Sequence, residues 1–146
     1  MPRILPTRRE VLLGGVCMLA THTPTMAAPA RLGDDGLYHL DWYLESFLDL
    51  TEDLGGAAAK LKRLAIIWGL KGCPACRRMH EQHLADPEIE NYVRNNFDIL
   101  HLDFIGAREV TDLTGRRRTE KATADAFGVR FTPTIQFFPE TVAGEV

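Results

Sequence analysis

Hydrophobic and polar positions alternate along the chain in blocks that predict an α/β fold. Between residues 37 and 54 the apolar residues recur at helical spacing with acidic residues between them, which predicts a helix that Gly55-Gly56 ends. Short apolar runs at 64–70, 97–104 and 134–138 are typical of buried strands. Helices are expected between these runs, and the alternation of strand and helix is typical of a layered α/β domain.

Three further helices are predicted around these strands. One begins near Pro74 and runs to about Leu84. Asp86-Pro87-Glu88 begins the next, because Asp is a good N-cap, Pro fits the first turn and Glu lies near the positive end of the helix dipole. The segment 120–127 predicts a short helix that Gly128 ends.

Composition limits the classes of function. The 146 residues are enough for one domain and carry a net charge of −3, so no basic surface indicates nucleic-acid binding. No apolar run reaches the roughly 18 residues needed to span a bilayer. The polar segment 105–119 predicts a long loop, in which Arg116-Arg117-Arg118 are expected to be solvated rather than to form a docking patch for an acidic partner.

Residues 1–30 have the pattern of an export signal. A basic start precedes a short apolar stretch from Val11 to Ala20, and Ala28-Pro29-Ala30 fits an A-x-A cleavage site. Arg8-Arg9 before the apolar stretch resembles a twin-arginine signal, although an ordinary export signal can also contain this pair. We therefore expect a cleaved signal over 1–30, an exported, periplasmic domain over 31–146, and loss of Cys17 with the signal.

The remaining cysteines form the pair Cys73-Pro74-Ala75-Cys76. Cys73 falls where a predicted strand ends and a predicted helix begins, so its sulfur is expected near the free N–H groups of the first helical turn. That position favours the thiolate, which is the nucleophile in disulfide exchange. Cys76, one turn further along, is expected to be the buried thiol that resolves the mixed disulfide.

Two other interpretations of the pair remain. Cys73, Cys76, His80 and His83 superficially resemble a zinc set, but on one helix the four side chains would have to converge within about two turns. A purely structural disulfide would close a very short loop and stabilise little. We therefore predict no metal site, and we expect the two histidines to be surface or partly packed residues.

A strand, a Cys-x-x-Cys pair at a helix start and a distant Thr132-Pro133 before a strand together resemble the thioredoxin superfamily. "CPAC", "LADPEIENYVRNNFDILHLDF" and "RFTPTIQFFPE" are most similar to its periplasmic SoxW-like branch. Over residues from about 37 to the end, the resemblance implies a thioredoxin-like fold with a central sheet flanked by helices. It also implies a thiol–disulfide oxidoreductase in which Cys73 and Cys76 form the redox-active disulfide. Thr132 and a cis Pro133 would bind the substrate chain.

The same resemblance implies the partners. The substrates would be protein disulfides, such as those of sulfur-oxidation or cytochrome-maturation proteins, and a membrane thiol donor of the DsbD or CcdA kind would supply electrons. No cofactor is implied. Reduction is the favoured direction, and an oxidase or isomerase is the alternative within the enzyme class. A metal-binding or disulfide-stapled interaction module is the alternative outside it.

The chain departs from the usual thioredoxin pattern at three places. Ile67 stands where a buried Asp usually accepts the proton of the resolving thiol, and Gly72 replaces the Trp that usually precedes the first cysteine. After Val146 the fold would continue with a last strand and a helix. We therefore expect a fold truncated at its C-terminus, a fragment of a longer product in which 134–138 is an exposed edge strand prone to aggregation.

Overall fold

The computed structural model describes residues 29–140, so most of the predicted signal and the last six residues lie outside the described part. The elements of the described part follow one another as β1 (Arg31–Leu32), β2 (Tyr38–His39), α1 (Leu50–Ala59), β3 (Arg63–Gly69), α2 (Pro74–Arg78), the π-helical turn η1 (Met79–His83), α3 (Pro87–Asn96), β4 (Phe97–Asp103), β5 (Glu109–Thr111), β6 (Arg117–Thr119), α4 (Glu120–Ala126) and β7 (Thr134–Phe137). Within these residues no helix is long and apolar enough to cross a membrane.

The central sheet has the strand order β4-β3-β7. Strand β3 pairs parallel with β4 and antiparallel with β7, which makes the sheet mixed. In this register Ile67 lies between His101 of β4 and Ile135 of β7. Within residues 29–140 strand β7 is an edge of the sheet, with Ile135 40% and Phe137 60% exposed.

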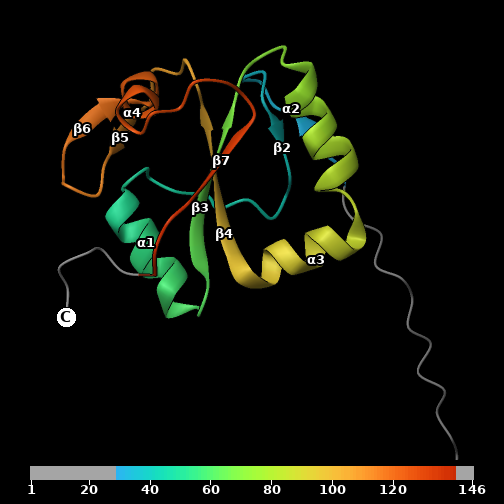
Figure 1. Cartoon of the computed structure of the whole chain (residues 1–146), viewed down its shortest axis with the longest axis horizontal. Helices are drawn as coiled ribbons and strands as arrows, with labels where there is room; N and C mark the ends of the chain where they lie inside the picture. Colours follow the sequence, from blue (N-terminus) through green and yellow to red (C-terminus); the bar gives the residue numbers. More distant parts are fainter. Residues whose placement is uncertain (1–28, 141–146) are drawn as a thin grey trace, which may run out of the picture.

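Alternate side chains of β3 enter two different cores, as the period of a strand requires. Leu64, Ile66 and Trp68 pack with α1 and α4, whereas Ala65 and Ile67 pack on the opposite face with residues of η1 and α3. Figure 1 shows α1 and α4 on one side of β3 and β4, and α2 and α3 on the other. The predicted α/β architecture, a central sheet flanked by helices, is confirmed.

The predicted helix over 37–54 is wrong. Residues 38–39 form β2, residues 40–48 are largely irregular, and α1 begins only after Asp49, whose carboxylate accepts from the N–H groups of Thr51 and Glu52. The apolar residues at helical spacing serve both cores, because Leu40 packs on the α3 face and Leu48 on the α1 face. Helix α1 also runs through Gly55-Gly56, which are exposed.

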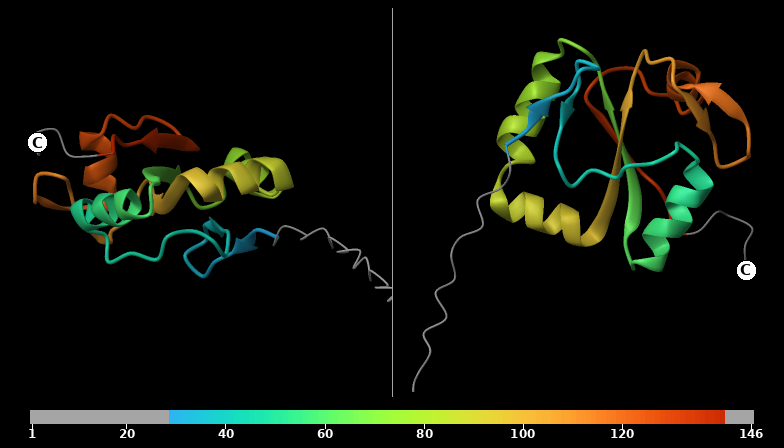
Figure 2. Two further views of the ribbon diagram at one scale, coloured as in Figure 1. Left: turned by 90° about the horizontal axis from the view of Figure 1, so that it is seen from below. Right: turned by 180° about the vertical axis from the view of Figure 1, so that it is seen from behind.

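Short strands β1 and β2 pair with each other and not with the central sheet. Figure 2 shows them as a separate layer in the view from below (left), and as a hairpin in front of α2 in the view from behind (right). The segment that follows passes the edge of β4, where the N–H of Leu44 donates to the carbonyl of Ile99 at 2.8 Å. The N-terminal segment therefore packs on the sheet face that carries α2 and α3 as far as Tyr43, and from Leu44 on it packs on the opposite face.

The predicted loop over 105–119 contains a small hairpin. Strands β5 and β6 pair antiparallel, and the arginines there make ion pairs: Arg117 with Glu109, and Arg118 with Asp112. The expectation that these arginines are simply solvated is correct for the side chain of Arg117, which is largely exposed, but not for Arg118, which is half-buried. The predicted starts of α3 at Asp86 and of α4 before Glu120 are confirmed.

Candidate functional site

The cysteine pair lies at the carboxyl end of β3, where the chain turns into α2. Gly72 makes this turn with a φ of 74°, a conformation that favours glycine. Cys73 is the N-cap of α2, and Pro74 occupies the first turn, as predicted. The two cysteines form a disulfide with 5.3 Å between their Cα atoms.

The two sulfurs have different surroundings. The Sγ of Cys73 accepts from the backbone N–H of Cys76 at 3.1 Å, and Cys73 is only half-buried. Cys76 is 3% exposed. When the disulfide is reduced, the same N–H group is placed to stabilise a thiolate on Cys73. This arrangement suits an attacking outer thiol and a buried resolving thiol.

Thr132, the residue before Pro133, lies against Cys73. The hydroxyl of Thr132 donates to the Sγ of Cys73 at 3.5 Å, and the Thr132 carbonyl oxygen lies 3.9 Å from the same sulfur. The predicted cis bond between Thr132 and Pro133 is confirmed. The structure therefore brings together the four residues that the sequence singled out.

A cavity of about 380 Å³ opens beside Cys73. Its lining combines apolar surface from Leu32 and Tyr38 with the cationic side chains of Lys71 and Arg77. Arg77 donates to Glu81 at 2.8 Å, so part of its charge is neutralised on the outer surface of the helix. The cavity thus brings apolar and cationic side chains next to the sulfur of Cys73.

A group of buried imidazoles lies behind the cysteine pair, on the sheet face that carries α2. His80 of η1 is fully buried and His101 of β4 is 6% exposed, with 5.1 Å between their ring centroids. Burial, together with the neighbouring His80, lowers the pKa of His101 to about 3. Burial also lowers the pKa of His80. The expectation that His80 is a surface or partly packed residue is therefore wrong, whereas His83 is exposed.

The sequence did contain a signal for His80. It follows Cys76 by four residues, and such positions share one face of a helix, so a buried Cys76 implies a buried neighbour at His80. His101 gave no comparable signal, because its burial depends on the pairing of β4 with β3. There it is the register partner of Ile67, the residue that stands at the usual position of a buried Asp.

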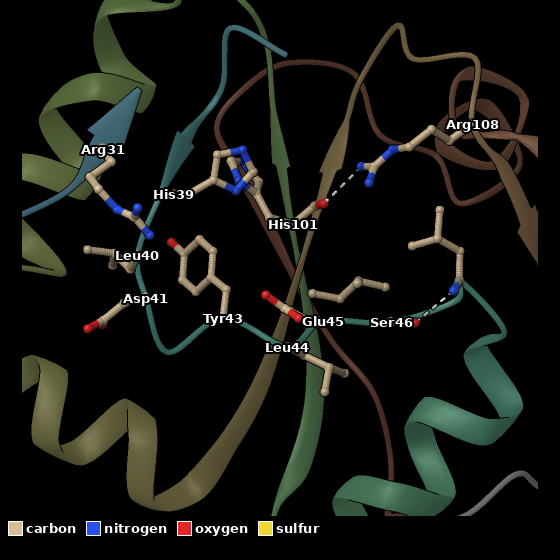
Figure 3. Close-up of a pocket in the computed structure, with 12 residues that line it drawn as sticks. Arg31, His39, Leu40, Asp41, Tyr43, Leu44, Glu45, Ser46, His101 and Arg108 are labelled. Carbon is tan, nitrogen blue, oxygen red and sulfur yellow. Dashed lines mark hydrogen bonds between the residues drawn. The ribbon is translucent and has the colours of Figure 1, made fainter. Parts of the chain in front are cut away.

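A second cavity, also of about 380 Å³, lies between the irregular segment 40–48 and β4. Figure 3 shows the rings of His39, Tyr43 and His101 on one side of it and the Arg108 guanidinium on the other. One guanidinium nitrogen of Arg108 donates to the carbonyl of His101 at 3.3 Å. This cavity is lined by polar groups and does not include the cysteines.

The zinc-type interpretation of the cysteine pair finds no support in the geometry. Cys73 and Cys76 are joined to each other, the Nδ1 of His80 is bonded to the carbonyl of Cys76, and His83 faces solvent. Within residues 29–140 no group of three or more His, Cys, Asp or Glu side chains has a geometry that could hold a metal ion.

Comparison with protein families matches residues 50–143 to the family described as "Thioredoxin-like domain". A thioredoxin-fold protein from Helicobacter pylori is a similar solved structure, with 17% identity and a TM-score of 0.48 over 62% of this chain and 67% of that one. A search of curated proteins found no match. The matched region includes the cysteine pair, Thr132, Pro133 and all three strands of the central sheet. The chain therefore belongs to the thioredoxin-like domain family, and its fold is thioredoxin-like.

Proposed function

We propose that this chain is an exported thiol–disulfide oxidoreductase that reduces disulfide bonds in periplasmic proteins. The observation that carries the proposal is the asymmetry of the pair: Cys73 is accessible and accepts an N–H bond at the start of α2, while Cys76 is buried behind it. A pair with only a structural role needs neither feature. Membership of the thioredoxin-like domain family supports the same class of reaction.

The reaction would run in two exchange steps. In the first, the thiolate of Cys73 attacks one sulfur of a substrate disulfide, forms a mixed disulfide and releases the other substrate sulfur as a thiolate. In the second, Cys76 loses its proton and attacks the Sγ of Cys73, which releases the second substrate thiolate and forms the Cys73–Cys76 disulfide. The substrate gains two electrons and the cysteine pair loses two.

Thr132 would hold the substrate during the first step. Its carbonyl and hydroxyl both face the Sγ of Cys73, so a substrate chain that pairs with the backbone of Thr132 would bring its disulfide to the attacking sulfur. The adjacent cavity, with Lys71 and Arg77, would favour segments that combine apolar and acidic side chains. Main-chain pairing of this kind gives affinity without requiring one substrate sequence.

The direction and the partners rest on the resemblance to the SoxW-like branch. We propose that a membrane thiol donor of the DsbD or CcdA kind re-reduces the pair, and that the substrates are sulfur-oxidation or cytochrome-maturation proteins. Export through the N-terminal signal would place the protein in an oxidising compartment, where the pair stays oxidised unless a donor reduces it.

The test is insulin reduction by the full chain together with the reduction potential of the pair. We expect insulin reduction with dithiothreitol as the electron source, and a potential near that of thioredoxin, about −270 mV. A potential near that of DsbA, about −120 mV, would instead identify a disulfide oxidase. Failure to reduce insulin and to oxidise a reduced protein substrate would leave the interaction-module interpretation.

A further inference from the structure

The second exchange step requires a base near Cys76. A buried thiol is held in its neutral form, because burial disfavours the charged thiolate, yet only the thiolate can attack the mixed disulfide. Ile67, which is 1% exposed on the same face of the sheet, has no group that accepts a proton. The proton of Cys76 therefore goes to water or to another group on this face.

His80 is a buried imidazole on the same helical face as Cys76. It follows Cys76 by four residues, both side chains are buried, and its Nδ1 lies 2.8 Å from the carbonyl oxygen of Cys76. A carbonyl only accepts, so the proton of the neutral ring is on Nδ1 and the lone pair is on Nε2. Within the described residues this Nε2 is buried and has no hydrogen-bond partner, the sulfur of Cys76 in the disulfide included. A buried lone pair without a donor is uncommon, and this one is available to accept a proton from the thiol that reduction frees on Cys76.

The imidazoles continue from His80 toward the surface. The ring of His101 lies 5.1 Å from that of His80 and 5.3 Å from that of His39, measured between centroids. Both ring nitrogens of His101 are also buried and without partners in the described part of the chain. The Nε2 of His39 contacts the carboxylate of Asp35 at 2.9 Å, and both side chains are partly exposed. Three rings thus lie in a row between the backbone of Cys76 and an acid at the surface, with no hydrogen bond from ring to ring in the described part of the chain.

The groups that face the ring of His80 are mostly neutral. Tyr38 and Tyr43 contribute aromatic rings 6.2 and 5.7 Å from that of His80, and the buried hydroxyl of Tyr43 has no partner among residues 29–140. From the other side, Arg108 approaches only the backbone carbonyl of His101. Charged groups lie instead around the two outer rings: besides this guanidinium and the Asp35 carboxylate, Arg31, Asp41 and Glu45 line the cavity that His39 and His101 also line.

The close approach of Gly69 to His101 shows how the ring is accommodated. A Cβ added at Gly69 would lie 2.5 Å from the Nε2 of His101, so the absence of a side chain in β3 provides the space that the ring occupies. The imidazole of His101 therefore fits on this face of the sheet because β3 has a glycine beside it.

We propose that His80 is the proton acceptor for Cys76, and that the proton then leaves toward solvent on the side where His101, His39 and Asp35 lie. The proposal rests on the proposed oxidoreductase function. When Cys76 attacks the mixed disulfide, its S–H proton moves to Nε2 of His80, the S–S bond between Cys73 and the substrate breaks, and the substrate leaves as a thiolate. The ordinary pKa of a thiol, about 8.5, lies above that of an imidazole, about 6.5, so the proton transfer is unfavourable. The charged ring therefore forms only transiently.

The test separates the two exchange steps with the aryl disulfide dithiobis(nitrobenzoate) and the reduced full chain, in which Cys17→Ser removes the third thiol. Each step releases one coloured thiolate, first by attack of Cys73 and then by attack of Cys76, so stopped-flow absorbance resolves both. For His80→Gln we expect the second phase to slow at least about tenfold near pH 7 and to rise about tenfold per pH unit, as for a thiol that loses its proton to solvent. The first phase should be unchanged. His83→Gln, at the exposed histidine of the same turn, is the matched control and should leave both phases unchanged.

The outcomes distinguish this inference from the proposed function. A second phase in His80→Gln with the rate and pH dependence of the unmodified protein would overturn the assignment of His80. An unmodified protein without a second phase would contradict the oxidoreductase function, and the inference with it. If His80→Gln does not fold, nitrogen-15 NMR of the reduced, unmodified protein decides: a proton on Nε2 rather than Nδ1 of His80 would overturn the proposal, and a proton on Nδ1 would support it.

Discussion

Thr132 and Cys73 are 59 residues apart in the sequence, and the hydroxyl of one donates to the sulfur of the other at 3.5 Å. The same sulfur accepts from the N–H of Cys76, so donors from two distant parts of the chain converge on it. Charge that develops on Cys73 is therefore stabilised both by its own helix and by the segment that precedes β7.

The two cysteines should differ in reactivity after reduction. Because Cys73 is accessible and receives the N–H bond, it should be alkylated at neutral pH at least about tenfold faster than the buried Cys76. Cys73→Ser should abolish insulin reduction, whereas Cys76→Ser should accumulate mixed disulfides with substrates. Mass spectrometry of the alkylated peptides and of trapped adducts measures both effects. Equal, slow alkylation of the two thiols would contradict a catalytic role for the pair.

Removal of the Thr132 hydroxyl should weaken the thiolate of Cys73. Thr132→Val keeps the branched shape but removes a hydrogen bond worth about 1 kcal/mol, so alkylation of Cys73 at pH 7 should slow by about fivefold. The rate of reaction with iodoacetamide across a pH series measures the change. Thr134→Val is the control, because that hydroxyl donates to the carbonyl of Phe131 and does not contact the sulfur. Equal rates for Thr132→Val and the unmodified protein would show that the hydroxyl does not stabilise the thiolate.

Acid should destabilise the fold through His101. Its pKa is lowered to about 3 by burial, whereas in the unfolded chain it is about 6.5. The unfolded state therefore binds the proton first, so the stability that neutral His101 contributes is complete above pH about 6.5. It is lost as the pH falls toward 3, by up to about 1.4 kcal/mol per pH unit.

Urea unfolding between pH 4 and pH 7.5 measures this loss, with pH values chosen to bracket about 6.5. His101→Leu should flatten the difference between the two ends of the range, and His83→Gln should not. A pH profile of His101→Leu parallel to that of the unmodified protein would assign the acid sensitivity to other groups.

Gly69 and His101 should be energetically coupled. Gly69→Ala would place a Cβ 2.5 Å from the imidazole and displace the ring, which should cost about 1–3 kcal/mol of stability. In a His101→Ala background the same change should cost far less, because the clash is gone. A double-mutant cycle from urea unfolding gives the coupling. Additive effects would mean that Gly69 is needed for a reason other than space for His101.

Glu120 should contribute to stability through its buried carboxylate. Its two oxygens accept from the backbone N–H groups of Asp103 and Arg108 and from the Arg108 guanidinium, and the residue is 1% exposed. In Glu120→Gln one accepting oxygen becomes an NH2 group, which would face the N–H donors that the oxygen now accepts from. We therefore expect the free energy of unfolding, measured with urea, to fall by about 2–4 kcal/mol. Glu109→Gln, which breaks an exposed pair with Arg117, should cost less than about 1 kcal/mol. Similar losses in the two variants would show that the buried carboxylate stabilises the fold no more than an exposed ion pair does.

The cysteine site could be predicted from the sequence because its determinants are local. A strand, a glycine turn and a proline in the first helical turn place Cys73 as the N-cap of α2, and the four-residue segment itself decides which sulfur is buried. The N-terminal segment could not be predicted, since its apolar residues recur at helical spacing but Leu40 and Leu48 belong to different cores. The spacing of apolar residues indicates which residues are buried, but it does not indicate which part of the fold they pack against.

The imidazole cluster was missed for a related reason. His39, His80 and His101 come from three separate elements, and only the pairing of β4 with β3 and the packing of the N-terminal layer bring them together. The hairpin of β5 and β6 was missed because its strands are only three residues each and rich in arginine, and their pairing is supported by contacts with acids elsewhere in the segment.

The antiparallel pairing of β7 with β3 also affects the order in which parts of the protein fold. Trp68 and Gln136, which are hydrogen-bonded across these strands, are 68 residues apart, so this contact closes a far longer loop than the turn that carries the cysteines. Long loops close late, because their entropy is lost before the contact is gained. During synthesis and refolding, Cys73 at the start of α2 would therefore be in place before Thr132, the residue that we propose holds the substrate. Until β7 docks, Thr132 does not lie beside this sulfur, and early chemistry at Cys73 would be unselective.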